Sequence, residues 1–533
     1  MTTASPAAPL VSRAEERKVI FASSLGTVFE WYDFYLYATL APFFAALFFP
    51  KGNDTAALLA AFATYAAGFL VRPFGALVFG RLGDLVGRKH TFMITIVIMG
   101  ASTFAVGLMP KYETIGILAP IILVTLRLLQ GLALGGEYGG AATYVAENAP
   151  NGQRGYATSW IQTTATIGFF LSLLVIGLCR FLQTPDDFKA WGWRVPFLVS
   201  IVLLIFSIYI RLKLEESPVF LRMKSQGKAS KSPLRDSFLR YPNNKLVLLA
   251  LLGATAGQGV VWYTGQFYAL FFLTITLKVD WLTAYCLVGI SLLLGTPFFV
   301  VFGRLSDRVG RLKIILGGCL LAALTYFPLF HGLAHNINPA LEEYSAKTPI
   351  TVAATDCNFH VFIGPKTHNS DCDKAKDFLT KSGLSFQSLP EVAGQTVVTK
   401  IGSTELDGWD DAKYKDALKA SGYPAEIDKS RINYGMAVLI LFILVLYVTM
   451  VYGPIAAFLV ELFPTQIRYT SMSLPYHIGN GWFGGMLPLL ATAMVAKSGD
   501  IYYGLWYPIV VALLTVVVGA IFLRENKGQS IEA

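Results

Sequence analysis

The sequence predicts an all-α membrane protein of twelve transmembrane helices in two six-helix repeats, with a small extracytoplasmic α/β insertion between helices nine and ten. Of the 533 residues, 54% are hydrophobic and 14% are charged, whereas a soluble protein carries about 25% charged residues. The apolar residues form long runs near the 20 residues that a helix needs to cross a bilayer. A loop motif that occurs twice indicates two related halves. A water-soluble enzyme is therefore not expected, and a disordered chain is excluded.

Twelve apolar runs are long enough to span the membrane. We expect them near 19–48, 57–80, 91–110, 115–146, 157–180, 194–212, 246–276, 283–304, 313–333, 435–462, 470–496 and 502–523. Lys and Arg gather in the connections at 81–90, 147–156, 213–245, 305–312 and 463–469. Because basic loops stay in the cytoplasm, both termini are expected there, in a bacterial inner membrane.

The domain division follows from these spans. We expect a cytoplasmic N-terminal tail at 1–18, a six-helix bundle at 19–212, a central cytoplasmic loop at 213–245, a second bundle at 246–333 and 434–523, and a cytoplasmic tail at 524–533. The net charge of +9 follows the loop bias and does not indicate a nucleic-acid partner. The five cysteines form no metal-binding pattern, and no metal or cofactor is expected.

Two pairs of similar segments relate the halves. GRLGDLVGRK at 80–89 recurs as GRLSDRVGRL at 303–312, after spans two and eight. ENAPNGQR at 147–154 and ELFPTQIR at 461–468 share Glu, Pro and Arg at the same spacing, after spans four and ten. The halves are therefore repeats of the same hand, which suits a transporter whose halves rock about a central site.

The unequal spacing of the repeats locates an insertion at about 334–433, on the outer face. Asp84 to Arg154 is 70 residues and Asp307 to Arg468 is 161, a difference of 91. Strands are expected at 350–355 and 396–401, and helices at 373–383 and 410–422, each helix followed by Gly. Cys357 and Cys372 could form a disulfide outside the cytoplasm. The alternative is a loose loop with many glycines.

Four stretches carry a resemblance to a known group. The repeated G-x-L-x-D-x-x-G-R resembles the signature loop of the major facilitator superfamily. GTVFEWYDFYLY at 26–37, RLLQGLALGGEYGGAATYVAENAP at 127–150 and GQGVVWYTGQFY at 257–268 resemble the metabolite:proton symporter family. That family takes up small organic acids and zwitterions such as shikimate, 2-oxoglutarate, citrate, proline and betaine. The resemblance covers the chain outside 334–433 and does not identify the substrate.

Charged residues inside the spans are the candidates for proton coupling. Glu30 and Asp33 lie in the first span, and Arg127 lies in the fourth. Glu30 and Arg127 are about 17 and 18 Å deep at 1.5 Å per residue, so acid and base are level. Protonation of Asp33 would release Arg127, which could then hold a substrate carboxylate bidentately. The alternative is a static ion pair that ties two spans together.

Further polar residues of the spans are assigned by their position. Arg72 and Glu137 lie nearer the inner side, where they either pair or line the inner path. In the seventh span Gln258, Trp262 and Gln266 are four residues apart and share a helix face. His477 is a second candidate for proton coupling. The residues expected to bind substrate are Arg127, Gln130, Gln258, Trp262, Tyr263, Gln266, Tyr268, Tyr476 and Asn480.

The repeated loops carry a second set of charges. By resemblance, these residues form ion pairs that close the inner side in one state and break as the halves rock. They are Asp84, Arg88, Glu147, Arg154, Asp307, Arg311, Glu461 and Arg468. The alternative is that they only set the topology, and the duplicated spacing argues against it.

These features predict a secondary active transporter that takes up a small organic acid or zwitterion with a proton and works as a monomer. One alternative is a proton-coupled antiporter that exports a small organic compound. Another is a transceptor, in which the outer insertion captures a ligand. An enzyme is not expected, because the spans contain no Ser–His–Asp arrangement or metal-binding set. Without an ATP-hydrolysing domain, the energy must come from a gradient or from the substrate itself.

Overall fold

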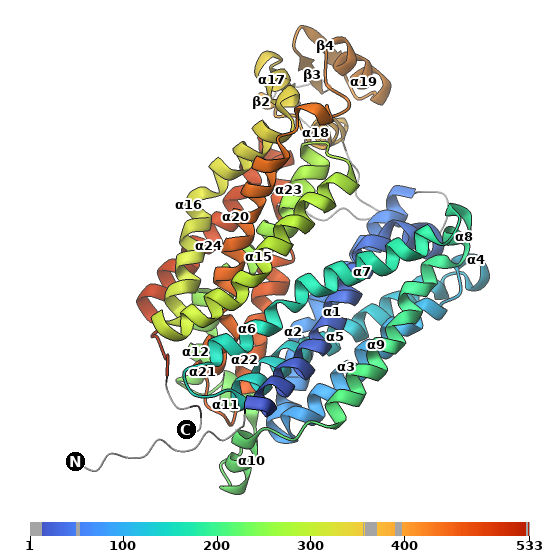
Figure 1. Cartoon of the computed structure of the whole chain (residues 1–533). Coiled ribbons are helices and arrows are strands. Elements are labelled where there is room, and N and C mark those ends of the chain that lie inside the picture. Colours follow the sequence, from blue (N-terminus) through green and yellow to red (C-terminus); the bar gives the residue numbers. More distant parts are fainter. Residues whose placement is uncertain are drawn as a thin grey trace.

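The computed structural model describes residues 13–49, 54–354, 357, 370–389, 397–528 and 531. Long helices form two bundles that lean against each other (Figure 1). The long helices of the first bundle are α1 (Arg13–Phe48), α2 (Asp54–Leu85), α3 (Arg88–Leu108), α5 (Leu118–Asn148), α6 (Arg154–Gln162), α7 (Thr164–Phe181) and α9 (Val195–Leu212). Short helices α4 (Tyr112–Ile115), α8 (Pro185–Ala190) and η1 (Gly192–Arg194) complete it. The predicted fifth span is thus two helices, α6 and α7, that meet at Thr163.

Two short helices, α10 (Pro218–Ser225) and α11 (Pro233–Phe238), link the bundles. The seventh span is a continuous helix, Asn243–Thr276, made of α12 (Asn243–Ala250), η2 (Leu251–Thr255), α13 (Ala256–Tyr263), η3 (Thr264–Tyr268), α14 (Ala269–Phe271) and η4 (Phe272–Thr276). The remaining helices of the second bundle are α15 (Trp281–Val309), α16 (Arg311–Ile337), α20 (Tyr434–Tyr452), α21 (Ile455–Leu462), α22 (Arg468–His477), η6 (Ile478–Gly484), α23 (Leu487–Ser498), η7 (Tyr503–Leu505) and α24 (Trp506–Phe522). The segments η2, η3, η4 and η6 are π-helical, a geometry that is frequent at functional sites.

Among the described residues, ten helices are long and apolar enough to cross a membrane. They fall at the positions of the third to twelfth predicted spans. Helices α1 and α2, of 36 and 32 residues, lie where the first two were expected. The chain is therefore a helical, multi-pass membrane protein, and the count of twelve spans stays a prediction.

The insertion is a small α/β unit at one end of the molecule (Figure 1). It contains α17 (Pro339–Lys347), β1 (Ile350–Ala353), α18 (Asp371–Lys381), β2 (Gln387–Leu389), β3 (Val398–Ile401), β4 (Thr404–Asp407), α19 (Asp411–Ala420) and η5 (Lys429–Arg431). The sheet order is β2-β1-β3-β4, with β1 and β2 parallel and the other pairs antiparallel. A disulfide joins Cys357 to Cys372. We call this end of the molecule the insertion end and the opposite end the gate end.

The unit has its own apolar core, which includes Val352, Leu379, Ile401 and Tyr414, each exposed by 1% or less. The two predicted strands and two predicted helices are therefore present as β1, β3, α18 and α19, although Thr355 and Thr396 lie outside the described residues. Helix α17 and strands β2 and β4 were not predicted. The two strands are only three and four residues long and are mostly polar.

Glycines let α2 and α5 approach closely. A Cβ at Gly131 would lie 2.2 Å from the Gly68 carbonyl oxygen, and one at Gly135 would lie 2.2 Å from the Arg72 carbonyl oxygen. Because backbone atoms cannot yield as a flexible side chain can, larger residues would separate the helices. The glycine-rich stretch in α5 is thus a helix contact.

Gly135→Ala is expected to lower the free energy of unfolding by about 1–3 kcal/mol, since the methyl group overpacks the α2–α5 contact. The measurement is thermal unfolding of the purified protein in detergent. Gly177→Ala in α7 is the matched control, because a Cβ at Gly177 meets no atom within 4 Å. Equal melting temperatures for the two variants would contradict the packing argument.

Candidate functional site

A buried polar cluster surrounds Asp33 of α1. Its Oδ1 accepts hydrogen bonds from Thr103 Oγ1 on α3 at 2.9 Å and from Gln130 Nε2 on α5 at 3.2 Å. Arg127 Nη1 lies 3.2 Å from Oδ2 and forms the ion pair that the sequence predicted. All four side chains are buried. The carboxylate therefore faces three donors from two other helices of the first bundle.

Arg127 has further partners in the same cluster. It donates to Gln130 Oε1 at 2.5 Å, and its guanidinium lies 4.0 Å from the centre of the Tyr37 ring. A cation over an aromatic face is stabilised by the ring quadrupole. The sequence analysis missed Thr103 and Tyr37. Tyr37 could have been found, because it follows Asp33 by one helical turn.

Glu30, one turn before Asp33, is also buried, but within the described residues it makes no ion pair. Arg72 stacks on Phe69, with its guanidinium carbon 4.3 Å from the ring centre. His477 is buried against Tyr476, and its Nε2 has no hydrogen-bond partner in the described structure. Glu30 can therefore gain or lose a proton without breaking a salt bridge.

Glu137 does not pair with Arg72, which was one of the two alternatives for these charges. Its Oε1 lies 2.9 Å from Arg211 Nη2 in the last turn of α9, and Thr95 donates to its Oε2 at 2.9 Å. The guanidinium of Arg211 passes α1 at Gly26, where a Cβ would lie 1.5 Å from Nη2. Arg211 was not predicted as a site residue, because it ends an apolar run, where a basic residue suggests a loop.

Aromatic side chains join the two bundles at the level of these charges. Trp31 of α1 lies 5.1 Å from Trp262 of α13, measured between ring centres. Tyr263 lies 6.3 Å from Phe69 of α2, and Tyr35 contacts Gln266, with 3.5 Å between Oη and Oε1. Three of the predicted binding residues, Trp262, Tyr263 and Gln266, thus lie at the interface between the bundles.

A second group of polar contacts lies beside them. Gln258 and Asn480 exchange two hydrogen bonds between their side-chain amides, at 3.0 and 2.8 Å. Tyr476 stacks on Tyr138 of the first bundle with 3.7 Å between ring centres, and its hydroxyl lies 2.9 Å from that of Tyr452. The sequence analysis had not selected Tyr138 or Tyr452 as binding residues.

Tyr268 is the predicted binding residue that lies elsewhere. It packs against Phe272 and Phe330 of its own bundle, with 6.5 and 5.6 Å between ring centres. Tyr268 follows Gln266 by two residues, which is about 200° around the axis of a helix with 3.6 residues per turn, so it points away from the interface. Tyr268 was predicted as a polar aromatic residue of the seventh span and was not part of the face shared by Gln258, Trp262 and Gln266.

Buried ion pairs join the two bundles at the gate end. Asp84, at the end of α2, accepts hydrogen bonds from the backbone amides of Tyr469 and Thr470 at 3.3 and 2.8 Å. These amides belong to the first turn of α22 in the other bundle. Arg88 lies 2.8 Å from Asp84, and its second nitrogen donates to the Thr465 carbonyl at 2.8 Å. The Asp84–Arg88 pair thus connects the bundles.

Glu147, at the end of α5, completes this cluster. Its Oε1 lies 2.8 Å from Arg468 Nη1 in the other bundle and 3.5 Å from Arg88 Nη2. Ser217 donates to its other oxygen at 2.5 Å. One carboxylate is therefore shared by two arginines from opposite bundles.

The second copy of the motif repeats this arrangement with the bundles exchanged. Asp307, near the end of α15, accepts from the amides of Gly155 and Tyr156 at 2.9 and 2.8 Å, in the first turn of α6. Arg311 lies 2.9 Å from Asp307. A negative charge at a helix N-terminus satisfies amides that have no partner in the helix and is favoured by the helix dipole.

Glu461 occupies the place in the second cluster that Glu147 has in the first. Arg311 Nε lies 2.9 Å from its Oε2, and Arg154 Nη1 of the first bundle lies 3.3 Å from its Oε1. All eight predicted gate residues are thus brought together in two clusters, each of which crosses between the bundles.

Glu461→Gln is expected to destabilise the closed gate end by about 3–5 kcal/mol, because Arg154 and Arg311 stay buried with less compensating charge. The measurement is the distance between two spin labels, attached to cysteines that replace Gln153 and Lys313, one exposed site on each bundle. Cys286→Ser removes the exposed native cysteine. The measured distance should shift to longer values.

Glu343→Gln is the matched control, because Glu343 forms an exposed pair with Arg431, 2.6 Å apart, at the insertion end. Exposed pairs contribute little, so the distance between the labels should stay unchanged. A shift of equal size in both variants, or in neither, would contradict a locking role for Glu461.

Comparison with known proteins identifies the family. The model of the family "Sugar (and other) transporter" matches residues 18–247 and 419–533. The chain is 31% identical to the inner membrane metabolite transport protein YhjE of Escherichia coli K12, over 98% of this chain and 97% of that protein. It is 37% identical to the Escherichia coli K12 shikimate transporter, over 61% of this chain and 74% of that protein.

Solved structures agree with the fold. The major facilitator superfamily proton:xylose symporter XylE superposes with a TM-score of 0.65, covering 97% of this chain and 98% of that chain at 15% identity.

The proline/betaine transporter of Salmonella typhimurium is 36% identical over 62% of this chain and 67% of that protein. The chain therefore belongs to the major facilitator superfamily, in the family of sugar and other transporters, and is a membrane transporter.

Proposed function

We propose that the chain is a proton-coupled symporter that takes up a small organic acid or zwitterion by alternating access between two six-helix bundles. The observation that carries this proposal is the cluster of Asp33, Thr103, Arg127 and Gln130. It holds a carboxylate and a guanidinium 3.2 Å apart inside the spanning helices, where charged groups are costly and mark substrate or proton paths.

The orientation is part of the proposal. The connections at the gate end are rich in Lys and Arg, so we infer that the gate end and both termini face the cytoplasm and that the insertion faces the periplasm. The buried pairs of Glu147 and Glu461 then close the inner side, as expected of an outward-facing state. A monomer suffices, since both gate clusters form within one chain.

Coupling follows from the contacts of Asp33. In its ionised form the carboxylate holds Arg127, whereas a protonated Asp33 no longer attracts the guanidinium. Arg127 can then take the carboxylate of a substrate through a charge-assisted pair. Glu30 is the second proton site, because it can take up a proton without breaking an ion pair. Trp262, Tyr263 and Gln266 provide the aromatic and amide surface on the facing bundle.

The substrate class rests on this chemistry and on the relatives. Arg127 suits a carboxylate, and the Gln258–Asn480 amides suit hydroxyl or amide groups. The names of the relatives include a shikimate transporter and proline/betaine transporters. Shikimate, proline and betaine are therefore the first three probes.

Proteoliposomes with an imposed pH gradient, acid outside, provide the test. A symporter should accumulate a probe inside and acidify the lumen together with it, as followed by radiolabel and by an enclosed pH dye. Asp33→Asn is expected to reduce pH-driven accumulation at least about tenfold. The variant removes the carboxylate whose protonation decides whether Arg127 pairs with residue 33 or with the substrate. Arg127→Ala should abolish binding of the carboxylate probes.

Asp377→Asn is the matched control, since this acid forms an exposed pair with Lys381 in the insertion and should leave uptake unchanged. An acid exterior that drives the probe out of preloaded vesicles would indicate an antiporter and overturn the proposal. Capture of the probe by the protein without transport would indicate a transceptor. Full coupling in Asp33→Asn would refute the role of Asp33.

A further inference from the structure

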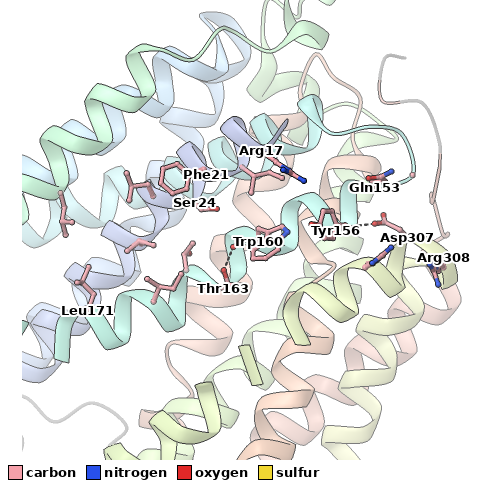
Figure 2. A pocket seen from close by; sticks show the side chains of 18 residues that line it. Arg17, Phe21, Ser24, Gln153, Tyr156, Trp160, Thr163, Leu171, Asp307 and Arg308 are labelled. Carbon is pink, nitrogen blue, oxygen red and sulfur yellow. Dashed lines mark hydrogen bonds between the residues drawn. The ribbon is translucent and has the colours of Figure 1, made fainter. Parts of the chain in front are cut away.

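A cleft of about 1,040 Å³ runs along the side of the molecule at the gate end. Figure 2 shows it between α1, the α6–α7 pair and the end of α15, so both bundles contribute to its walls. It is separate from the central aromatic interface, because none of the predicted binding residues lines it. Its volume is at the upper end of the range of about 300–1,000 Å³ that small-ligand sites occupy.

The cleft is basic near the start of α1 and the end of α15, the region that we call its mouth. Arg17 of α1 and Arg304 and Arg308 of α15 line it, and all three are exposed. Within the described residues none of the three guanidinium groups takes part in an ion pair. The one acid of the lining, Asp307, already accepts the amides of Gly155 and Tyr156 and faces Arg311. The cleft therefore presents three cations and no uncompensated anion.

The wall away from the mouth is apolar and is exposed on the outside of the helices. Phe21 is 63% exposed and Ile167 is 50% exposed, and Leu171 continues the wall along α7 (Figure 2). Trp160, 39% exposed, lies between the basic mouth and this wall, beside Tyr156. Trp and Tyr favour the level of the lipid headgroups. The order along the cleft is thus guanidinium, aromatic ring and aliphatic side chain.

We propose that this cleft binds an acidic phospholipid of the leaflet at the gate end, with the headgroup phosphate on Arg17, Arg304 and Arg308 and an acyl chain along Ile167 and Leu171. Basic pockets between spanning helices on the cytoplasmic side recognise such headgroups, and guanidinium groups bind phosphate through paired hydrogen bonds. A soluble anion would use the mouth alone and gain nothing from the apolar wall.

The site would also act on the conformational cycle. Arg17 belongs to the first bundle, and Arg304 and Arg308 belong to the second, on either side of the Asp307 contact with α6. A phosphate between them bridges the bundles only while the gate end is closed. Bound lipid should therefore favour the closed gate end, because a ligand shifts an equilibrium toward the state that binds it better.

The test uses the full-length protein in detergent, titrated with dioleoyl phosphatidylglycerol or dioleoyl phosphatidylcholine, with bound lipids counted by native mass spectrometry. Wild type should prefer phosphatidylglycerol. The triple variant Arg17→Gln, Arg304→Gln, Arg308→Gln should lose at least about tenfold of that affinity, since each basic group near the surface contributes roughly fivefold. The control triple Lys228→Gln, Lys231→Gln, Arg235→Gln removes the same charge from the linker and should bind as wild type does.

A second variant separates a lipid from a soluble anion. Leu171→Trp fills the apolar wall without changing the charge, and it should weaken phosphatidylglycerol binding while the melting temperature of the protein stays unchanged. Glycerol 3-phosphate should not displace the lipid. Equal losses in the cleft triple and the control triple, undiminished binding by Leu171→Trp, or displacement by glycerol 3-phosphate would each overturn the proposal.

Discussion

The reciprocal capping of one bundle by the other is the interaction on which the rest of the structure depends. Asp84 satisfies the first amides of α22, and Asp307 satisfies the first amides of α6. Each carboxylate lies near the C-terminal end of a helix in one bundle and accepts hydrogen bonds from the first amides of a helix in the other. If the bundles separate there, the first amides of α22 and α6 lose these acceptors. Four arginines are buried beside these contacts with carboxylates. Burial makes the closed arrangement specific, and the cost of an unpaired buried charge makes a half-open one unfavourable. This combination suits the alternating access that we propose, which needs an element with two stable arrangements.

The central region distributes its chemistry unequally between the bundles. The Asp33–Arg127 pair and its hydrogen-bonding partners belong entirely to the first bundle, whereas the Gln258–Asn480 pair belongs entirely to the second. Contacts between the bundles in this region are mainly aromatic, as in the Trp31–Trp262 and Tyr138–Tyr476 pairs. Stacked rings can slide without leaving a charge or a hydrogen-bonding group unpaired. A relative movement of the bundles would therefore shift aromatic surfaces past one another, while each polar network stays within its own bundle.

Much of this arrangement could be predicted from the sequence, because it depends on patterns that act along the chain. Long apolar runs mark spanning helices, and a duplicated motif with matching spacing predicts two clusters of the same composition, as found for Glu147 and Glu461. What the sequence could not show depends on contacts across the fold. Arg211 reaches Glu137 only because Gly26 leaves room for its guanidinium. Packing likewise decides which side of the seventh helix faces the first bundle, and Tyr268, on the opposite side of the helix from Gln266, packs against Phe330 of its own bundle.

The insertion illustrates how a folded unit can enter a transporter without disturbing it. The backbone amide of Asn433 donates to the Asn336 carbonyl at 2.8 Å, so the chain returns to the second bundle where it left. The closure of this loop therefore adds little strain to α16 and α20. The unit is then held to the same bundle by the Phe386 amide, which donates to the Gly499 carbonyl at 2.7 Å, and by the Lys429–Asp280 pair at 2.9 Å. Lys429 also lowers the pKa of Asp280 to about 2, so this exposed pair stays charged throughout the neutral range. Because these contacts lie on the second bundle, the rocking motion that we propose would carry the insertion along with that bundle.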